Sequence, residues 1–368
     1  MYDPFRRTRA RANRQIRRAT LTALNDAWGA LLTPATPSKP KSPKKSVKSA
    51  TAKRRQGRAS TAEKPKSPGK ARTAGRRGSF TTKTYENAFG TVSCKLYTPG
   101  VAQSGSDRLP LIVMLHGCGQ SPDDFARGTG MNAVAKEHGC MVLYPAQARK
   151  SQLNRCWNWF KRENQVRGAG EPALIADLTR QIIADHPVDP AKVYVAGLSA
   201  GASAALVLAT AYPDIFAAVG VHSGLTVGAA HDASSAATAM QSGNPGRRTG
   251  VKMPTIIFHG DADKVVSPRN GRFVAIRALE GFDSLDRTER TGRVAGGRSY
   301  ERTVHRIGRG RPWVETWVIN GAGHGWSGGN AKERFTDSGG PDASRAMMRF
   351  FLRHRTTALR RSNATGPT

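Results

Sequence analysis

Ser199 lies in a pattern that is typical of a catalytic nucleophile. The segment 193–201 reads V-Y-V-A-G-L-S-A-G, in which an apolar run leads into a G-x-S-x-G motif, and a helix of small residues is predicted over 200–211. Such a motif also arises by chance, but a strand before it and a helix after it favour a sharp turn that exposes the serine hydroxyl. The first N–H groups of that helix would face developing negative charge. Ser199 is therefore our candidate nucleophile.

A serine nucleophile needs a base, and the base needs an orienting acid. Asp261 and Asp263 follow a predicted strand at 255–259, and His324 follows another at 313–319. The order serine, acid, histidine is the order found in α/β-hydrolases, and 64 and then 61 residues separate the serine, Asp263 and His324. We favour Asp263 as the acid, with Asp261 as a turn former, and His324 as the base; a structural loop histidine is the alternative. Three other histidines at predicted strand ends, His116, His222 and His259, are expected to be structural.

The same chemistry requires two backbone N–H donors that hold the oxyanion. One is expected from Ala200, which directly follows the nucleophile. The second should come from the loop after an earlier strand, and the segment L-H-G-C-G-Q at 115–120 fits that place. Its glycines would let the backbone approach a substrate closely. Cys118 is our candidate for this N–H, and its thiol is not needed as a nucleophile.

The elements that must position these residues alternate along the chain. After a hairpin at 81–97, we predict strands at 109–115, 140–144, 192–196, 216–222, 255–259 and 313–319, and helices at 124–138, 172–185, 200–211, 271–279 and 344–355. This alternation indicates an α/β fold with a mostly parallel sheet that is flanked by helices. Two segments, 226–250 and 283–312, do not follow the alternation and are expected to be loops or insertions.

The charge divides the chain into two unlike parts. The whole chain has 58 Lys and Arg against 26 Asp and Glu, a net charge of +32. Residues 1–80 hold 22 basic and 3 acidic side chains, and residues 81–368 hold 36 and 23. We expect one globular domain at 81–358, a flexible tail at 359–368, and a separate basic N-terminal region.

The N-terminal region itself has two kinds of sequence. Residues 1–32 can form a basic amphipathic helix, with a weakly helical solvated arm as the alternative. Residues 33–80 are rich in Lys, Pro, Ser and Ala and are predicted to be disordered, because they offer little apolar surface to bury. The segments S-P-K-K at 42–45 and K-S-P at 66–68 resemble repeats of histone tails. Contact with nucleic acid or a granule surface is one hypothesis for this region, and a solvated linker is the other.

Composition excludes several other classes of protein. No apolar run is long enough for a membrane span, and the N-terminus lacks the pattern of a secretory signal. Four cysteines are too few for a disulfide scaffold, and their spacing matches no zinc motif. We therefore expect no metal and no cofactor. The cytoplasm, with possible granule association, is the expected location, and the oligomeric state stays open.

Several segments in the same order resemble one family of enzymes. They are LHGCGQ (115–120), DDFARGTGMNAVAKEHGCMVLYPAQ (123–147), CWNWF (156–160), RGAGEPALI (167–175), GLSAG (197–201), HGDADKVV (259–266) and GAGHGWSGG (321–329). Together they resemble the esterases of the polyhydroxybutyrate depolymerase family, which are relatives of feruloyl and acetylxylan esterases. The resemblance implies an α/β-hydrolase fold and serine hydrolysis of carboxylic esters. It implies the same roles for Ser199, Asp263, His324 and Cys118, and it does not extend to residues 1–80.

The resemblance also implies features around the cleft. Trp157 and Trp159 would lie near it, although buried packing is an equal alternative, and Trp326 would form a wall of the pocket. A disulfide between Cys118 and Cys156 is a further hypothesis, and such a bond would be unusual in a reducing cytosol.

For function, we expect a serine esterase that acts on poly(3-hydroxybutyrate) or on hydroxyacyl oligomers. The first alternative is a carbohydrate esterase that removes feruloyl or acetyl groups. The second is a basic granule- or nucleoid-binding protein with a vestigial hydrolase fold. Export is the alternative to the cytoplasm, because related esterases are often secreted.

Overall fold

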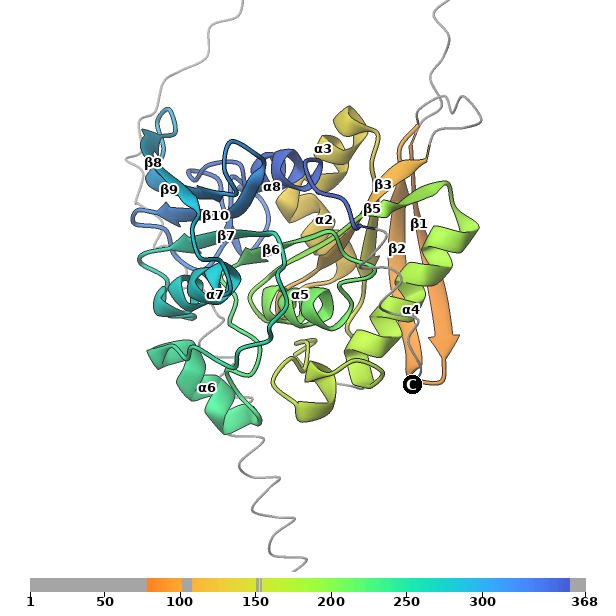
Figure 1. Ribbon diagram of the computed structural model, residues 1–368. Coiled ribbons are helices and arrows are strands. Elements are labelled where there is room, and N and C mark those ends of the chain that lie inside the picture. Colours follow the sequence, from red (N-terminus) through yellow and green to blue (C-terminus); the bar gives the residue numbers. More distant parts are fainter. Residues whose placement is uncertain (1–77, 101–107, 150–151, 153, 358–368) are drawn as a thin grey trace, which may run out of the picture.

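The structure is a computed structural model that describes residues 78–100, 108–149, 152 and 154–357 (Figure 1). The expected elements at 1–32, most of the segment 33–80, and the tail at 359–368 lie outside these residues. The strands of the main sheet are β1 (Ser79–Asn87), β2 (Gly90–Thr98), β3 (Leu109–Leu115), β4 (Met141–Pro145), β5 (Val188–Leu198), β6 (Ala218–His222), β7 (Thr255–Gly260), β8 (Asp286–Arg293), β9 (Ser299–Arg306) and β10 (Pro312–Ile319). The helices are α2 (Pro122–Thr129), α3 (Met131–His138), α4 (Gly170–Asp185), α5 (Ala200–Ala211), α6 (Ala233–Ser242), α7 (Arg269–Leu279) and α8 (Ala343–Phe351). A 3₁₀ turn, η1 (Arg162–Gln165), and a small pair of strands, β11 (Trp326–Ser327) and β12 (Thr336–Asp337), complete the domain.

The ten strands form one sheet in the order β1-β2-β4-β3-β5-β6-β7-β10-β9-β8. The six strands from β4 to β10 in this order pair in parallel, whereas β1 and β2 at one edge and β9 and β8 at the other pair antiparallel. The predicted α/β architecture with a mostly parallel sheet is confirmed. Because the carboxyl ends of parallel strands meet at one edge, the loops after β3, β5, β7 and β10 lie where a common site can form.

Two apolar cores lie on opposite faces of the sheet. In β3, Leu111 and Val113 pack into the core that α4, α5 and α7 cover, while Ile112 and Met114 pack into the core that α2, α3 and α8 cover. This division follows from the period of two along a strand, which sends alternate side chains to opposite faces. Burial on both faces explains why this strand reads as a continuous apolar run. In the described part of the chain, no helix is long and apolar enough to cross a membrane.

The structure corrects several predicted boundaries. The helix predicted at 124–138 is two helices, because Gly130 adopts a left-handed conformation (φ 62°) that ends α2 and precedes α3. Strand β1 begins at Ser79, two residues before the expected start of the domain at 81. Strand β5 begins at Val188 instead of residue 192.

Both segments that were expected to be loops contain regular structure. Segment 226–250 contains α6, which Asp232 caps by accepting a hydrogen bond from the Ser235 N–H. Segment 283–312 contains the antiparallel pair β8 and β9 at the sheet edge. Every residue of β8 except one is exposed, so its sequence, D-R-T-E-R-T-G-R, has no apolar alternation that could have indicated a strand.

Candidate active site

Ser199 occupies a strained turn between β5 and α5. Its backbone has φ 58° and ψ −121°, a conformation that residues other than glycine rarely adopt. The neighbouring glycines have no room for a side chain: a Cβ on Gly201 would lie 2.2 Å from the Leu115 carbonyl oxygen, and one on Gly197 would lie 2.4 Å from the Gly201 backbone. The Ser199 N–H donates to the carbonyl of His222 at 2.9 Å, which ties the turn to β6. This is the strand–turn–helix geometry typical of the G-x-S-x-G motif, and it leaves Ser199 7% exposed.

Asp263 and His324 form a hydrogen-bonded pair. The His324 Nδ1 lies 2.7 Å from Asp263 Oδ2, and Asp263 Oδ1 accepts the N–H groups of Val265 and Val266, each at 2.9 Å. Burial alone would raise the pKa of Asp263. Hydrogen bonds from His259 and His324 lower it by more than burial raises it, so the net pKa is below its ordinary value and the carboxylate stays ionised. An ionised carboxylate only accepts hydrogen bonds, so Nδ1 of His324 holds the proton and Nε2 is free to act as a base.

Asp261 has a different role in the same loop. It is exposed, and its Oδ1 accepts the N–H of Gly321 at 2.6 Å. It therefore fastens the loop after β7 to the loop that holds His324, in keeping with the expected turn former. Between Ser199 Oγ and His324, the described residues show no hydrogen bond.

The loop after β3 is bonded to the loop that precedes α4. A disulfide with an S–S distance of 2.05 Å joins Cys118 to Cys156. Nearby, the Trp157 indole donates to the His116 carbonyl at 3.0 Å, and the Gly119 N–H donates to the Asn154 carbonyl at 2.7 Å. These bonds fix the backbone around Cys118, the residue expected to supply one oxyanion donor. The other expected donor, Ala200, is the first residue of α5, where N–H groups have no acceptor within the helix.

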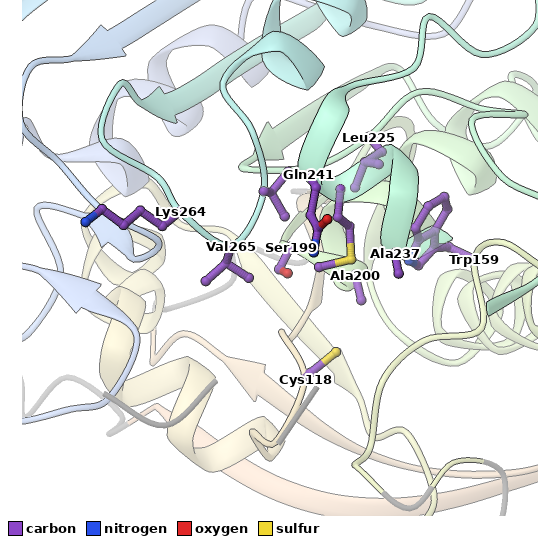
Figure 2. A pocket seen from close by; sticks show the side chains of 11 residues that line it. Cys118, Trp159, Ser199, Ala200, Leu225, Ala237, Gln241, Lys264 and Val265 are labelled. Carbon is purple, nitrogen blue, oxygen red and sulfur yellow. The ribbon is translucent and has the colours of Figure 1, made fainter. Parts of the chain in front are cut away.

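An apolar pocket opens beside Ser199. Figure 2 shows its lining side chains, with Ser199 between Trp159 on one side and Val265 and Lys264 on the other. The lining residues are Cys118, Trp159, Ser199, Ala200, Leu225, Ala237, Met240, Gln241, Lys264, Val265 and Val266. An apolar cavity with a few polar groups beside a nucleophile can bind an acyl group and exclude water from it.

Two of the three tryptophans predicted to line the pocket do not line it. Trp157 is 2% exposed, and its indole N–H is bonded to a carbonyl inside the protein. Trp326 is 1% exposed, donates to Ser344 Oγ at 3.1 Å, and stacks on His222 with ring centroids 5.1 Å apart. Both rings pack in the core with their polar atom satisfied. The pocket wall predicted for Trp326 was therefore wrong, and for Trp157 the alternative of buried packing holds. Only Trp159 of the three reaches the pocket.

Three histidines near the site have structural contacts. His116 accepts the Gln147 N–H and His222 accepts the Ser327 N–H, at 3.1 and 3.0 Å. Burial lowers the pKa of His116 to about 4 and that of His222 to about 3, so both rings are neutral at pH 7. His259 Nε2 lies 2.9 Å from the Val266 carbonyl, where it supports the acid loop.

Sequence reasoning missed one wall of the pocket. Ala237, Met240 and Gln241 belong to α6, and Leu225 lies in the segment before it. These residues belong to no recognisable motif, and they come next to Ser199 only when the chain folds. The sequence therefore contains no local signal that could have indicated them. In the described part of the chain, no group of three or more His, Cys, Asp or Glu side chains could hold a metal ion.

Comparison with known proteins places this geometry in a family. Residues 92–299 match the family model described as esterase PHB depolymerase. Poly(3-hydroxyalkanoate) depolymerase C of Paucimonas lemoignei is 34% identical over 230 residues, which cover 59% of this chain and 55% of that protein. Feruloyl esterase B of Thermothelomyces thermophilus is 30% identical over 207 residues, which cover 51% of this chain and 69% of that protein.

The fold has a counterpart among solved structures. An acetyl xylan esterase from Aspergillus awamori aligns with a TM-score of 0.57 at 21% identity, over 75% of this chain and 100% of that one. The α/β-hydrolase fold is thereby confirmed. The chain spans about half the length of depolymerase C, so the similarity covers only part of that protein. The family model covers more than half of the chain, and the protein belongs to the PHB depolymerase family of esterases.

Proposed function

We propose that the protein is a serine esterase with Ser199 as nucleophile, His324 as base and Asp263 as orienting acid. His324 Nε2 takes the Ser199 proton while Oγ bonds to the ester carbonyl carbon, and the backbone N–H groups of Cys118 and Ala200 hold the oxyanion. The alcohol leaves with the proton from His324. Water then attacks the acyl-enzyme by the same route, and its proton passes through His324 as the acid is released.

One observation above all supports this chemistry. Ser199 sits in a strained φ 58° turn, at the mouth of an apolar pocket that it lines together with both expected oxyanion residues. Such strain persists only where the surrounding structure holds it, and it is concentrated at active sites. The Asp263–His324 hydrogen bond supplies an oriented base in the same domain.

For the substrate, we propose esters of short hydroxyacyl groups, with poly(3-hydroxybutyrate) or its oligomers first. Two relatives named as depolymerases of such polyesters, at 34% and 35% identity, support this choice. Removal of feruloyl or acetyl groups from carbohydrate is the second candidate. It is supported by the relatives named as feruloyl and acetylxylan esterases, and by the aromatic wall that Trp159 offers.

The test begins with Ser199→Ala and the hydrolysis of p-nitrophenyl butyrate. Loss of the nucleophile should reduce kcat by more than about a thousandfold with an unchanged circular dichroism spectrum. The matched control is Ser234→Ala, an exposed serine of α6 that does not line the pocket, which should keep full activity. Retained turnover in Ser199→Ala would remove this residue from the mechanism.

A substrate panel separates the two candidates. We expect higher kcat/KM on 3-hydroxybutyrate oligomers than on methyl ferulate or acetylated xylan. The opposite order would favour the carbohydrate esterase.

We propose separately that the basic region at 1–77 binds an anionic polymer such as DNA or an anionic granule surface. Only its composition supports this: all of the 22 basic side chains of residues 1–80 lie within it, against 3 acidic ones.

A further inference from the structure

Glu171 is a carboxylate close to the site that the proposed reaction does not use. It is the second residue of α4 and is partly buried, where it borders a second pocket together with Gln147, Trp157 and Asn158. Its carboxylate accepts the Asn158 N–H at 2.9 Å, Asn158 Nδ2 at 2.7 Å and Gln147 Nε2 at 2.5 Å. Glu171 therefore joins two segments of the chain through neutral N–H donors.

Gln147 connects Glu171 to the loop after β3, whose residues 116–119 we call the oxyanion loop. The backbone N–H of Gln147 donates to His116 Nε2 at 3.1 Å, and His116 Nδ1 lies 2.8 Å from the Gly117 carbonyl oxygen. The side-chain amide of the same residue donates to Glu171. Glu171 thereby orients the residue that holds the His116 ring.

Asn158 belongs to the other segment that is bonded to the oxyanion loop. Two residues before it, Cys156 forms the disulfide with Cys118. Between them, the Trp157 indole donates to a carbonyl of the oxyanion loop at 3.0 Å. Because Glu171 accepts both the backbone and the side-chain N–H of Asn158, it fixes this segment one residue after Trp157. A displacement of Asn158 would reach the Cys118 backbone through these bonds.

A carboxylate fits these donors better than an amide would. Oε1 of Glu171 accepts the two side-chain amides and Oε2 accepts the Asn158 N–H, and an ionised carboxylate has only acceptors. A glutamine at this position would turn its NH₂ group toward at least one of those donors. Burial raises the pKa of Glu171, whereas the hydrogen bonds from Asn158 and Gln147 favour the charged form. The first turn of α4 also favours negative charge.

We propose that Glu171 is a positioning residue, which holds the segments of Gln147 and Asn158 so that the Cys118 N–H is placed for the oxyanion. Glu171 is not among the described residues that line the pocket beside Ser199, so it acts through the oxyanion loop. This inference rests on the proposed esterase function and adds a residue to it. Because the oxyanion forms only on the way through the transition state, a displaced donor should lower kcat and leave KM nearly unchanged.

The test is Glu171→Gln, which keeps the size of the side chain and removes its charge. We expect kcat for p-nitrophenyl butyrate to fall about tenfold to hundredfold, while KM changes less than about twofold. The ketone 1,1,1-trifluoro-2-pentanone adds to a catalytic serine and forms an oxyanion, so its inhibition constant should rise by a similar factor. A loss of folded protein alone would lower the total rate and leave this inhibition constant unchanged.

The matched control is Glu163→Gln. Glu163 is exposed and borders the same second pocket, but among the described residues it has no hydrogen bond to Gln147 or Asn158. Its replacement removes the same charge and should leave kcat, KM and the inhibition constant unchanged. An unchanged inhibition constant in Glu171→Gln, or an equal rise in both variants, would overturn the positioning role.

Gln147→Met provides a second test that does not depend on the folding of Glu171→Gln. It removes the amide that donates to Glu171 and keeps the backbone N–H that donates to His116. We expect kcat to fall and the inhibition constant to rise about threefold to tenfold, as for the loss of one hydrogen bond, with KM unchanged. No change in either quantity would contradict the proposal. Failure of the parent protein to hydrolyse p-nitrophenyl butyrate, or full activity of Ser199→Ala, would instead overturn the proposed esterase function.

Discussion

Asp261 and Asp263 lie two residues apart after β7, and the structure gives their carboxylates different partners. Asp263 is buried and bonded to His324, whereas Asp261 is exposed and bonded to a backbone N–H of the neighbouring loop. The choice between them could be made from sequence only as a preference, because both residues follow the strand closely. Only the folded chain shows that Asp263 is buried and that Asp261 is exposed.

This difference leads to a prediction for two matched variants. Asp263→Asn should lower kcat by up to about ten-thousandfold, because an amide no longer holds His324 in the tautomer with the proton on Nδ1. Asp261→Asn keeps an oxygen that can accept the Gly321 N–H, so its activity should fall less than tenfold. The measurement is kcat for p-nitrophenyl butyrate with both variants confirmed as folded. A larger loss in Asp261→Asn would reverse the assignment of the acid.

Two buried neutral histidines predict how stability depends on pH. Burial lowers the pKa of His116 to about 4 and of His222 to about 3, from an ordinary value of 6.5. At a pH between the ordinary value of 6.5 and these lowered values, the two histidines are protonated in the unfolded chain but not in the folded protein. The free energy of unfolding should therefore decrease as the pH falls below 6.5. Each histidine contributes at most about 1.4 kcal/mol per pH unit. Asp263 adds nothing in this window, because its lowered pKa lies beneath it.

Urea unfolding at pH 7.0, 6.0 and 5.0 measures this dependence. We expect the midpoint to be highest at pH 7.0 and to fall at each step. A free energy of unfolding that is constant from pH 7.0 to 5.0 would show that the two rings are not held neutral.

At the scale of elements, α6 forms a wall of the pocket that sequence did not indicate. Ala237, Met240 and Gln241 face the pocket, while Ala236 and Ala239 of the same helix are buried beneath it. The helix is held in place by hydrogen bonds that Asn270 and Ser267 of the following segment donate to its last carbonyl groups. The small side chain at 237 therefore sets how much space an acyl group finds on this side.

Filling that space should change selectivity for acyl length. In Ala237→Phe, kcat/KM for p-nitrophenyl octanoate should fall at least tenfold more than kcat/KM for p-nitrophenyl acetate, because the ring occupies the volume of the longer chain. Ala233→Phe places the same ring on the same helix at a residue that does not line the pocket. It should leave kcat/KM for both esters unchanged. Equal losses for both esters in Ala237→Phe would indicate that acyl groups bind elsewhere.

The elements differ in how far sequence could predict them. Strands such as β3 and helices such as α5 combine continuous burial with clear end signals, and their bounds agree with those expected. The hairpin β8–β9 has no apolar face in β8, so it is stabilised by pairing with its neighbours and not by a pattern of its own. The tryptophans could not be separated from sequence either. Trp157 and Trp159 lie in one segment, C-W-N-W-F, and only the tertiary packing makes Trp159 a pocket wall and Trp157 a core residue.

At the scale of the whole molecule, the disulfide bears on the cellular compartment in which the protein acts. The Cys118–Cys156 bond links two loops of the site across 38 residues, while Cys94 and Cys140 are free and buried. Disulfides persist in oxidising compartments and are rare in the cytosol. We infer that the exported alternative agrees better with this bond than the cytoplasmic location first expected.

Removal of residues 1–77 tests whether charge and catalysis are separable. A shortened chain should begin at residue 78, because β1 starts at Ser79 and pairs along its whole length with β2. This change removes 22 basic and 3 acidic side chains, whereas the site and both cores lie beyond it. The kcat for p-nitrophenyl butyrate should therefore stay within about twofold of the full chain.

Binding to DNA should respond in the opposite way. Each phosphate that a lysine or arginine neutralises adds about −0.9 to the slope of log K against log salt concentration, so a chain with 22 more basic residues should show a steeper slope. We expect residues 78–368 to lose most of the affinity for a 30-base-pair duplex at 50 mM salt, and to have a slope that is smaller by several units. The remaining net charge of 36 basic against 23 acidic side chains leaves some attraction, which acts without sequence preference. Equal affinity and equal slope for the two chains would place the anion-binding surface on the hydrolase domain, where the arginines of β8 and β9 would be the next residues to substitute.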